Sequence, residues 1–158
     1  MNSKRVRLPS ACVDEHIAPG VIAALRRTLR TTEAGRREDL RGRDERSYIG
    51  ELLSENSIFV TSDLEFVEYV RDHEVRHAGI IFIHGSMANA EKESFAEVAS
   101  IIVRGACRSS SRAFRNRIVY PAPEGIRLHE LHKGQKLVMS YDWMRDLYGL
   151  PPEVDLDK

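Results

Sequence analysis

The feature that most constrains the fold is an unbroken apolar run at residues 80–83, Ile-Ile-Phe-Ile, within a predicted strand at 78–83. Such a strand is typical of a parallel sheet that helices cover on both faces. Shorter runs of strand type occur at 11–13 and 58–60, and a segment with helical spacing follows each of the three runs. Strands that alternate with helices through short connections indicate a parallel sheet. We therefore predict an α/β fold of three layers, α/β/α, with a mainly parallel central sheet.

Amphipathic helices are predicted wherever apolar residues recur at intervals of three and four. These segments are 21–30, 44–55, 64–72 and 91–107. Residues 31–34 suit a further short strand, whereas 35–43 has turn residues and charges without an apolar period and reads as an exposed loop. Two more short strands, at 117–120 and 125–129, flank a Pro-Ala-Pro turn and predict an antiparallel edge.

The length of 158 residues fits a single core. We place the main domain at 1–107 and expect 108–158 to be a C-terminal extension packed on or next to it. This extension contains two short strands and a tail from Leu137 onward, in which Trp143 lies in a predicted helix. That helix is expected either to dock on the domain or to bind a partner, and the chain end beyond it to fray.

Composition excludes several classes of protein. The 24 Lys and Arg residues balance the 24 Asp and Glu residues, so the net charge favours neither nucleic acid nor membrane, and partners must be inferred from local charge. The chain has no apolar leader and no apolar run long enough to span a bilayer, which predicts a cytoplasmic protein without a membrane partner. Cys12 and Cys107 lack a CxxC spacing and are expected to be buried free thiols.

Acidic residues follow two of the predicted strands and begin the helix between them. Asp14 and Glu15 end the first strand, Asp63 and Glu65 follow the third, and Asp44 starts the intervening helix. In a doubly wound sheet, sites form outside the carboxyl ends of the strands where the strand order reverses. Carboxylates are the ligands that Mg²⁺ and Mn²⁺ prefer, and such ions activate water for the hydrolysis of phosphodiesters. The acids therefore predict a metal site at this edge.

Structural roles also suit some of these acids. The S-x-x-E pattern from Ser62 to Glu65 predicts a capping box, in which Ser62 accepts from the backbone N–H of Glu65. Asp44 and Glu45 suit a helix N-terminus, where the macrodipole favours negative charge. Neighbouring atoms of one turn can cap a helix and bind a metal, so both interpretations stay open.

The order of four motifs resembles a known family. The motifs are DEHI at 14–17, GRDE at 42–45, TSDLEF at 61–66 and HAGIIFI at 77–83. They resemble the D-E-N-L-like strand end, the G-x-x-D-x-x-I element, the T-x-D-x-D-F motif and the H-P-G strand of a small subgroup of PIN-like nucleases. Each motif alone is weak, but the four occur in the family's order over about residues 11–107.

The resemblance implies a hydrolase that cleaves RNA with an acid-bound Mg²⁺ or Mn²⁺, and many relatives look like toxins of VapC-type toxin–antitoxin pairs. The implied catalytic and metal-binding residues are Asp14, Asp44, Asp63 and Glu65. The residues implied to surround them are Glu15, His16, Thr61 and Ser62. Glu65 stands where the family has Asp, and His16 stands where it has Asn.

Cleavage of RNA requires positive charge near the acids, because phosphate contacts supply most of the sequence-independent affinity. A cluster just before Asp44 is the better candidate for this role. Its members are Arg36, Arg37, Arg41 and Arg43. A second basic stretch at 104–117 contains no acid. Solubility, or pairing with the acidic chain end, explains such clusters equally well.

The partners that follow from the resemblance are an RNA substrate and a cognate antitoxin, and Trp143 would also suit a groove between two copies of the chain. Two other classes stay open. The first is a catalytically silent PIN-like module that binds RNA or protein through its arginines and its tail. The second is a receiver-like signalling domain, because an acid pair after the first strand and an Asp after a middle strand also suit phosphorylation.

Overall fold

The computed structural model describes residues 8–108 and 110–140, which form one seven-stranded sheet and four α-helices. The strands are β1 (Ser10–Val13), β2 (Arg30–Glu33), β3 (Ser57–Thr61), β4 (Ile80–Phe82), β5 (Arg117–Ala122), β6 (Gly125–Glu130) and β7 (Gly134–Ser140). The helices are α1 (Pro19–Arg26), α2 (Glu45–Ser54), α3 (Leu64–Asp72) and α4 (Asn89–Ala106), with a 3-10 turn at Ala34–Arg36.

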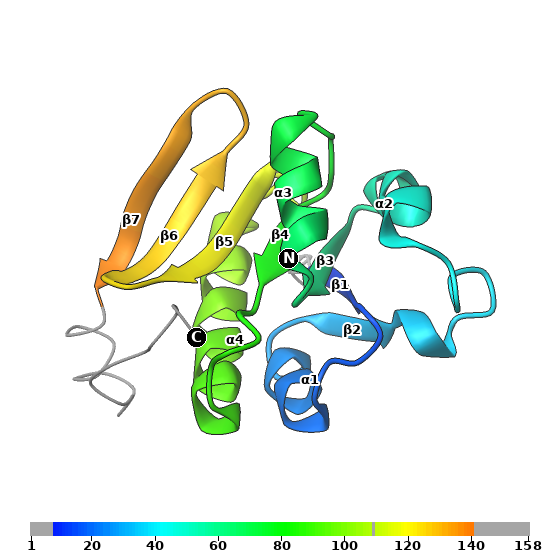
Figure 1. Cartoon of the computed structure of the whole chain (residues 1–158), viewed down its shortest axis with the longest axis horizontal. Coiled ribbons are helices and arrows are strands. Elements are labelled where there is room, and N and C mark those ends of the chain that lie inside the picture. Colours follow the sequence, from blue (N-terminus) through cyan, green and yellow to red (C-terminus); the bar gives the residue numbers. More distant parts are fainter. Residues whose placement is uncertain (1–7, 109, 141–158) are drawn as a thin grey trace, which may run out of the picture.

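The strand order is β2-β1-β3-β4-β5-β6-β7, which places β2 and β7 at opposite edges of the sheet (Figure 1). The first five strands of this order are parallel, and β6 and β7 continue the sheet as antiparallel strands. From β1 the chain first moves outward to β2 and then crosses to β3 on the other side of β1. The order of strands therefore reverses between β1 and β3, which makes their carboxyl ends the switch point of the sheet.

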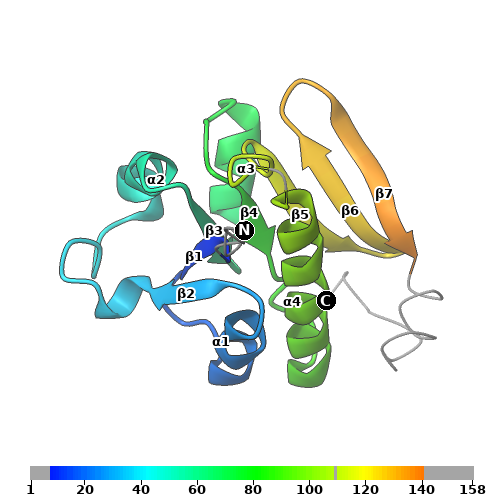
Figure 2. The same cartoon turned by 180° about the vertical axis from the view of Figure 1, so that it is seen from behind.

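Helices cover both faces of the sheet. One core contains apolar side chains of α1 and α4, and the other contains those of α2 and α3. Figure 2 shows α1 and α4 together on the face seen from behind. Strand β3 is buried along its whole length between these two cores. The predicted α/β fold with a mainly parallel sheet is confirmed, and its helices and strands form three layers.

The predicted helical periods correspond to real helices because their apolar faces are the buried ones. In α3, for example, Phe66, Val67 and Val70 are buried, as their spacing predicts. The segment 35–43, predicted as an exposed loop, is irregular and mostly exposed, but Leu40 is fully buried within it. Leu40 joins the core beneath α2 and so anchors the loop to the sheet.

The sheet and its core continue across position 107, where the sequence suggests the end of the main domain. Strand β5 pairs with β4 in parallel register, and its Ile118 and Val119 are buried in opposite cores. Strand β7 is a correction to the prediction of a tail that starts at Leu137, because residues 137–140 belong to this strand. Its apolar residues do not alternate because a register shift interrupts its pairing with β6, which hides the strand period. Trp143 and its predicted helix lie outside the described residues.

Both cysteines are buried free thiols, as their sequence context predicts. Cys12 lies in β1 and Cys107 follows the last turn of α4. Among the residues that the structure describes, no helix combines the length and the apolar character needed to cross a membrane.

Candidate functional site

A cleft of about 310 Å³ opens at the switch point of the sheet. Strands β1 and β3 are paired up to Val13 and Val60, and one further hydrogen bond of 2.8 Å runs from the Asp14 N–H to the Val60 carbonyl. This bond holds Asp14 directly beside the end of β3. The residues that line the cleft are Asp14, Glu15, His16, Arg43, Glu45, Ser62 and Asp63. We call it the acid cleft.

Asp14 is held from two sides. Its Oδ1 accepts a hydrogen bond of 2.8 Å from the Glu15 N–H, and its Oδ2 accepts one of 2.9 Å from the Thr61 hydroxyl. Burial raises the pKa of Asp14 above its ordinary value, and the hydrogen bond from Thr61 opposes this rise. The carboxyl group is therefore fixed in orientation and is partly deprived of water.

Asp63 combines a capping role with a place in the acid cleft. Its Oδ1 accepts a bond of 3.1 Å from the Phe66 N–H and so caps α3, and its own N–H donates to the Thr61 hydroxyl oxygen at 3.1 Å. Among the residues described, none donates a hydrogen bond to Asp63 Oδ2. This oxygen is available as a ligand, and the charge of Asp63 acts on Asp14 across the cleft.

The predicted capping box from Ser62 to Glu65 is wrong. The N-cap of α3 is Asp63, and Ser62 is exposed on the rim of the cleft. The helix starts one residue later than the S-x-x-E pattern suggests, because the buried Thr61 hydroxyl already binds the Asp63 N–H and turns the chain there. Glu65 lies in the first turn of α3, is exposed and does not line the cleft.

Glu45 is the residue of the site that the sequence interpretation misses. Asp44 is exposed and caps α2, because its Oδ1 accepts from the Arg46 N–H at 2.8 Å. Glu45, the first residue of α2, lines the acid cleft together with Asp14 instead. Burial raises the pKa of Glu45 to about 7, and the negative charge of Asp14 adds to the rise.

A signal for Glu45 exists in the sequence. Asp44 turns its side chain back to the first backbone N–H groups of α2 and is exposed there, whereas Asp63 caps α3 and also lines the cleft. The following acid, on the first helical residue, is then free to face the strand ends. The GRDE motif contains an acid that suits the N-cap, Asp44, and an acid that follows it, Glu45. Because Asp is preferred at the N-cap, Glu45 is the acid of this motif that is favoured to line the cleft.

Glu15 and His16, which follow Asp14 in the chain, also line the acid cleft. Glu15 Oε1 accepts a hydrogen bond of 2.9 Å from the Gly42 N–H, which ties the loop before α2 to the end of β1. His16 is exposed and has a φ of 69°, a left-handed backbone conformation that turns the chain away from β1. The residues predicted to surround the acids by resemblance therefore all lie at the end of β1 or β3, with Thr61 beneath the cleft.

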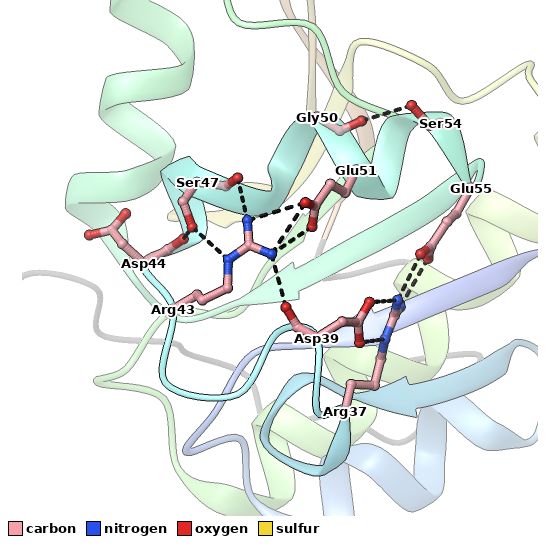
Figure 3. A network of polar contacts seen from close by, with 9 residues as sticks. All are labelled: Arg37, Asp39, Arg43, Asp44, Ser47, Gly50, Glu51, Ser54 and Glu55. Carbon is pink, nitrogen blue, oxygen red and sulfur yellow. Dashed lines mark hydrogen bonds and ion pairs between the residues drawn. The ribbon is translucent and has the colours of Figure 1, made fainter.

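Two of the four arginines predicted to bind RNA are engaged in the protein (Figure 3). Arg37 donates to Asp39 at 2.8 Å and to Glu55 at 2.7 Å. Arg43 donates to the Asp39 carbonyl at 2.9 Å, to the Ser47 carbonyl at 2.8 Å and to Glu51 at 2.9 Å. These guanidinium groups clamp the loop onto α2 and so place Glu45 at the cleft.

The other two arginines flank the acids. A neighbouring cleft of about 340 Å³ is lined by Arg36 and Arg41 and shares Asp14, Glu15 and His16 with the acid cleft. Arg36 is 82% exposed in its side chain and forms a long ion pair of 3.4 Å with Glu33. Arg41 is exposed, and its side chain has no ion pair within the described part of the chain. Both can therefore reach a phosphate beside the acid cleft.

The acid cleft suits a hard divalent cation in its donor chemistry. Within residues 8–108 and 110–140, no three His, Cys, Asp or Glu side chains lie close enough together to hold a metal ion as they stand. Asp14, Glu45 and Asp63 nevertheless face one cleft and act on one another through their charges. A cation that binds their carboxylate oxygens replaces the water lost by burial and relieves this repulsion. Carboxylate oxygens of this kind are the ligands that Mg²⁺ and Mn²⁺ prefer.

Fold and cleft together define an α/β protein with an acidic site at the switch point of a parallel sheet. No protein-family model matches the chain, and no curated protein or solved structure matches it significantly.

Proposed function

We propose that the chain is a metal-dependent endoribonuclease of the PIN-like class, a hydrolase of RNA phosphodiester bonds. The observation that carries this proposal is the convergence of Asp14, Glu45 and Asp63 on one cleft between the ends of β1 and β3. Ligand sites of doubly wound sheets form at this place. The order of the DEHI, GRDE, TSDLEF and HAGIIFI motifs supports the PIN-like class.

In this proposal Asp14, Asp63 and Glu45 hold Mg²⁺ or Mn²⁺. The ion, when bound, supplies an activated water and positive charge for the phosphate oxygens. Thr61 keeps Asp14 oriented, and the capped N-terminus of α3 does the same for Asp63. Metal ligands bind in their deprotonated form, so the raised pKa of Glu45 favours metal binding at neutral or higher pH.

Positive charge for the RNA backbone comes from Arg36 and Arg41, which line the cleft that adjoins the acids. Arginine forms paired hydrogen bonds with phosphate oxygens and keeps its charge at every physiological pH. The acids then act on the phosphodiester that lies beside the bound phosphate. In this proposal the chain acts in the cytoplasm as the toxin of a toxin–antitoxin pair. Its partners are a cognate antitoxin and a second copy of the chain, with which it forms a homodimer.

The test is cleavage of labelled single-stranded RNA by the purified chain with Mn²⁺ or Mg²⁺. We expect Asp14→Asn and Asp63→Asn to lower the rate by at least roughly 100-fold, because each removes a proposed ligand. Circular dichroism and urea unfolding check that both variants fold. Cleavage by folded Asp63→Asn at the wild-type rate points to a contaminant and removes the proposal.

A second pair of variants decides which acid of the GRDE motif belongs to the site. Glu45→Gln should lose activity, whereas Asp44→Asn should retain it, because Asn also caps helices well. Glu65→Gln serves as a further control, since Glu65 is exposed and outside the cleft. Loss of activity in Asp44→Asn with an unaffected Glu45→Gln would restore Asp44 as the third ligand.

Strand order favours one alternative, a receiver-like signalling domain. The order β2-β1-β3-β4-β5 is that of flavodoxin-like sheets, which such domains share, and Asp14, Glu15 and Asp63 stand at the expected strand ends. These domains look alike in having a Lys after their last strand. Here Ala122 ends the last parallel strand and Pro123 follows. Mass spectrometry after incubation with acetyl phosphate and Mg²⁺ tests this: no phosphate on Asp63 removes the alternative.

Calorimetric titration with Mn²⁺ separates the nuclease from a catalytically silent module. A nuclease of the proposed kind binds Mn²⁺ through Asp14 and Asp63, and the heat of binding disappears in Asp14→Asn. A folded wild-type chain that binds neither Mn²⁺ nor Mg²⁺ at millimolar concentration supports the silent module.

A further inference from the structure

We propose that the chain has a second phosphate-binding site, a basic groove that holds the backbone of the RNA at the opposite end of the sheet from the acid cleft. The groove has a volume of about 380 Å³. Its charged lining consists of Arg76, Arg115, Arg117, Lys133, His132 and Glu130. The identity of the bound polyanion as RNA rests on the proposed function.

The groove lies at the amino ends of the parallel strands. Arg76 precedes β4, Arg115 and Arg117 lead into β5, and Lys133 lies in the turn between β6 and β7. The acid cleft is at the carboxyl ends, and a parallel strand of five residues separates the two ends by roughly 17 Å. A long RNA strand can contact both, whereas a short oligonucleotide in the acid cleft cannot.

The groove is built on a fixed backbone frame. Asn116 Oδ1 accepts from the His77 N–H at 3.1 Å, and the Asn116 N–H donates to the His77 carbonyl at 3.0 Å. The Leu131 N–H donates to the Asn116 carbonyl at 3.1 Å. Three segments are thereby joined at Asn116, which has a φ of 60°. The basic side chains consequently start from fixed positions, which lowers the entropy lost when they bind a ligand.

Positive charge in the groove exceeds what the carboxylates of residues 8–108 and 110–140 neutralise. Glu130 is the single carboxylate in the lining, and it is shared at 3.7 Å by Arg117, at 3.7 Å by Lys133 and at 3.4 Å by Lys136. At the rim, His132 faces Glu74 at 3.4 Å. One carboxylate thus forms ion pairs with three cations, and Arg76 and Arg115 add two further positive charges to the groove.

Arg76 and Arg115 have no side-chain partner in the part of the chain that the structure describes. Neither side chain forms a hydrogen bond or an ion pair within residues 8–108 and 110–140. Arg115 Nε is also buried from solvent without a hydrogen-bond acceptor. The terminal nitrogens of the two guanidinium groups are the donors that remain for an anion in the groove. Two unpaired guanidinium groups beside one cavity favour phosphate, whose oxygens suit their fork of donors.

This groove explains part of the basic stretch at 104–117 that the acid cleft does not use. The chain as a whole is neutral, so attraction to RNA depends on local fields of this kind. Two phosphate sites at opposite ends of the sheet bind a long strand more tightly than either alone, because the second contact is intramolecular.

Binding is tested by fluorescence anisotropy of a labelled single-stranded RNA of about 16 nucleotides, near the upper size of single-strand sites. The titration contains EDTA, so that no cleavage occurs. We expect the double variant Arg76→Gln/Arg115→Gln to bind several-fold more weakly. Its plot of log affinity against log salt should lose about 1.4 of its slope, the value for two phosphate contacts with a single strand.

The matched control is Arg26→Gln/Arg27→Gln. Both arginines are exposed at the C-terminal end of α1, outside the groove, and their removal changes the net charge equally. Because Arg115 is half-buried, Arg76→Gln/Lys133→Gln, which changes only exposed side chains, provides a second measurement. The inference is overturned if either groove variant binds the RNA with the same affinity and the same salt slope as the control variant. It is also overturned by a groove-dependent affinity for an acidic peptide that exceeds the affinity for RNA.

The outcome is separable from that of the proposed function. If the groove variants weaken RNA binding in EDTA but no divalent cation produces cleavage, the groove stands and the nuclease assignment fails. If the wild type cleaves RNA and the groove variants bind long RNA as the wild type does, the groove fails alone. Cleavage of a short oligonucleotide should be unaffected in the groove variants, because it does not reach the groove.

Discussion

The Thr61 hydroxyl joins the ends of β1 and β3 by donating a hydrogen bond of 2.9 Å to Asp14 Oδ2. The same oxygen accepts the Asp63 N–H at 3.1 Å, so one buried hydroxyl sets the positions of two acids. Thr61 is fully buried, and its two bonds therefore form where water cannot replace them.

Replacing Thr61 by Val should destabilise the fold and disturb the site together. The variant keeps the shape but leaves Asp14 Oδ2 without its donor, at a cost of about 1 to 2 kcal/mol in the free energy of unfolding. Thr61→Ser keeps the hydroxyl and loses a methyl group, at a cost of about 1 kcal/mol. Urea unfolding measures both free energies. If the site depends on this bond, RNA cleavage falls in Thr61→Val and survives in Thr61→Ser; the reverse order contradicts it.

Glu45 should make the protein less stable as the pH rises. Its pKa is about 7 in the folded state against an ordinary value of 4.5, chiefly through burial. Between these values the folded chain keeps a proton that the unfolded chain has lost, so the free energy of unfolding falls as pH increases through this window. In Glu45→Gln this contribution is absent. Urea unfolding at pH 5 and pH 8 measures the free energy of unfolding of both proteins. The free energy of Glu45→Gln relative to the wild type should be higher at pH 8 than at pH 5.

His77 changes the free energy of unfolding with pH in the opposite direction to Glu45. The effect of Glu45 is therefore seen in the difference between the wild type and Glu45→Gln, in which the effect of His77 cancels. Burial lowers the pKa of His77 to about 4 from 6.5, and its Nδ1 accepts the Gly79 N–H at 3.1 Å. The unfolded chain therefore binds the extra proton between these values, and this contribution to stability is lost as pH falls. A pH-independent difference between wild type and Glu45→Gln would contradict the raised pKa of Glu45.

The strands and helices other than β7 follow from the sequence because the apolar residues of each segment are buried together. The site follows only in part. Asp14 and Asp63 are predictable because acids directly after buried strands must emerge at the switch point. For Glu45 the sequence offers only the N-cap preference of Asp44, because the two acids differ by one residue in a turn whose direction depends on the capping hydrogen bond.

The arginines show a similar limit. Arg36, Arg37, Arg41 and Arg43 form one cluster in sequence, yet two of them are committed to carboxylates and carbonyls that come from α2 and its loop. Charge density along a chain does not show which cations are already paired. The basic groove needs the fold as well, since Arg76 and Lys133 are far from Arg115 in sequence and meet only through the strand order.

Arg43 should contribute to stability and to the position of Glu45, whereas Arg41 should not. Arg43 binds the Asp39 and Ser47 carbonyls and Glu51, and its side chain is 37% exposed, so Arg43→Gln should cost about 1 kcal/mol. Arg41→Gln should stay within about 0.5 kcal/mol, as is usual for an exposed side chain. Thermal unfolding monitored by circular dichroism measures both. Equal losses in the two variants would show that the clamp in Figure 3 adds nothing.

Divalent cations should raise the melting temperature through Asp14 and Asp63. A ligand that binds only the folded state at a hundredfold excess over its Kd stabilises it by about 2.7 kcal/mol. For a domain of this size that corresponds to a rise of about 5 to 10 °C. Differential scanning fluorimetry with Mn²⁺, and then with EDTA added, should show the rise and its reversal. Asp63→Asn should melt at the same temperature with and without Mn²⁺, because Asn keeps the helix cap but loses the charge that binds the ion. A rise in Asp63→Asn equal to that of the wild type would place the cation elsewhere, and Glu65→Gln, which leaves the cleft intact, should respond like the wild type.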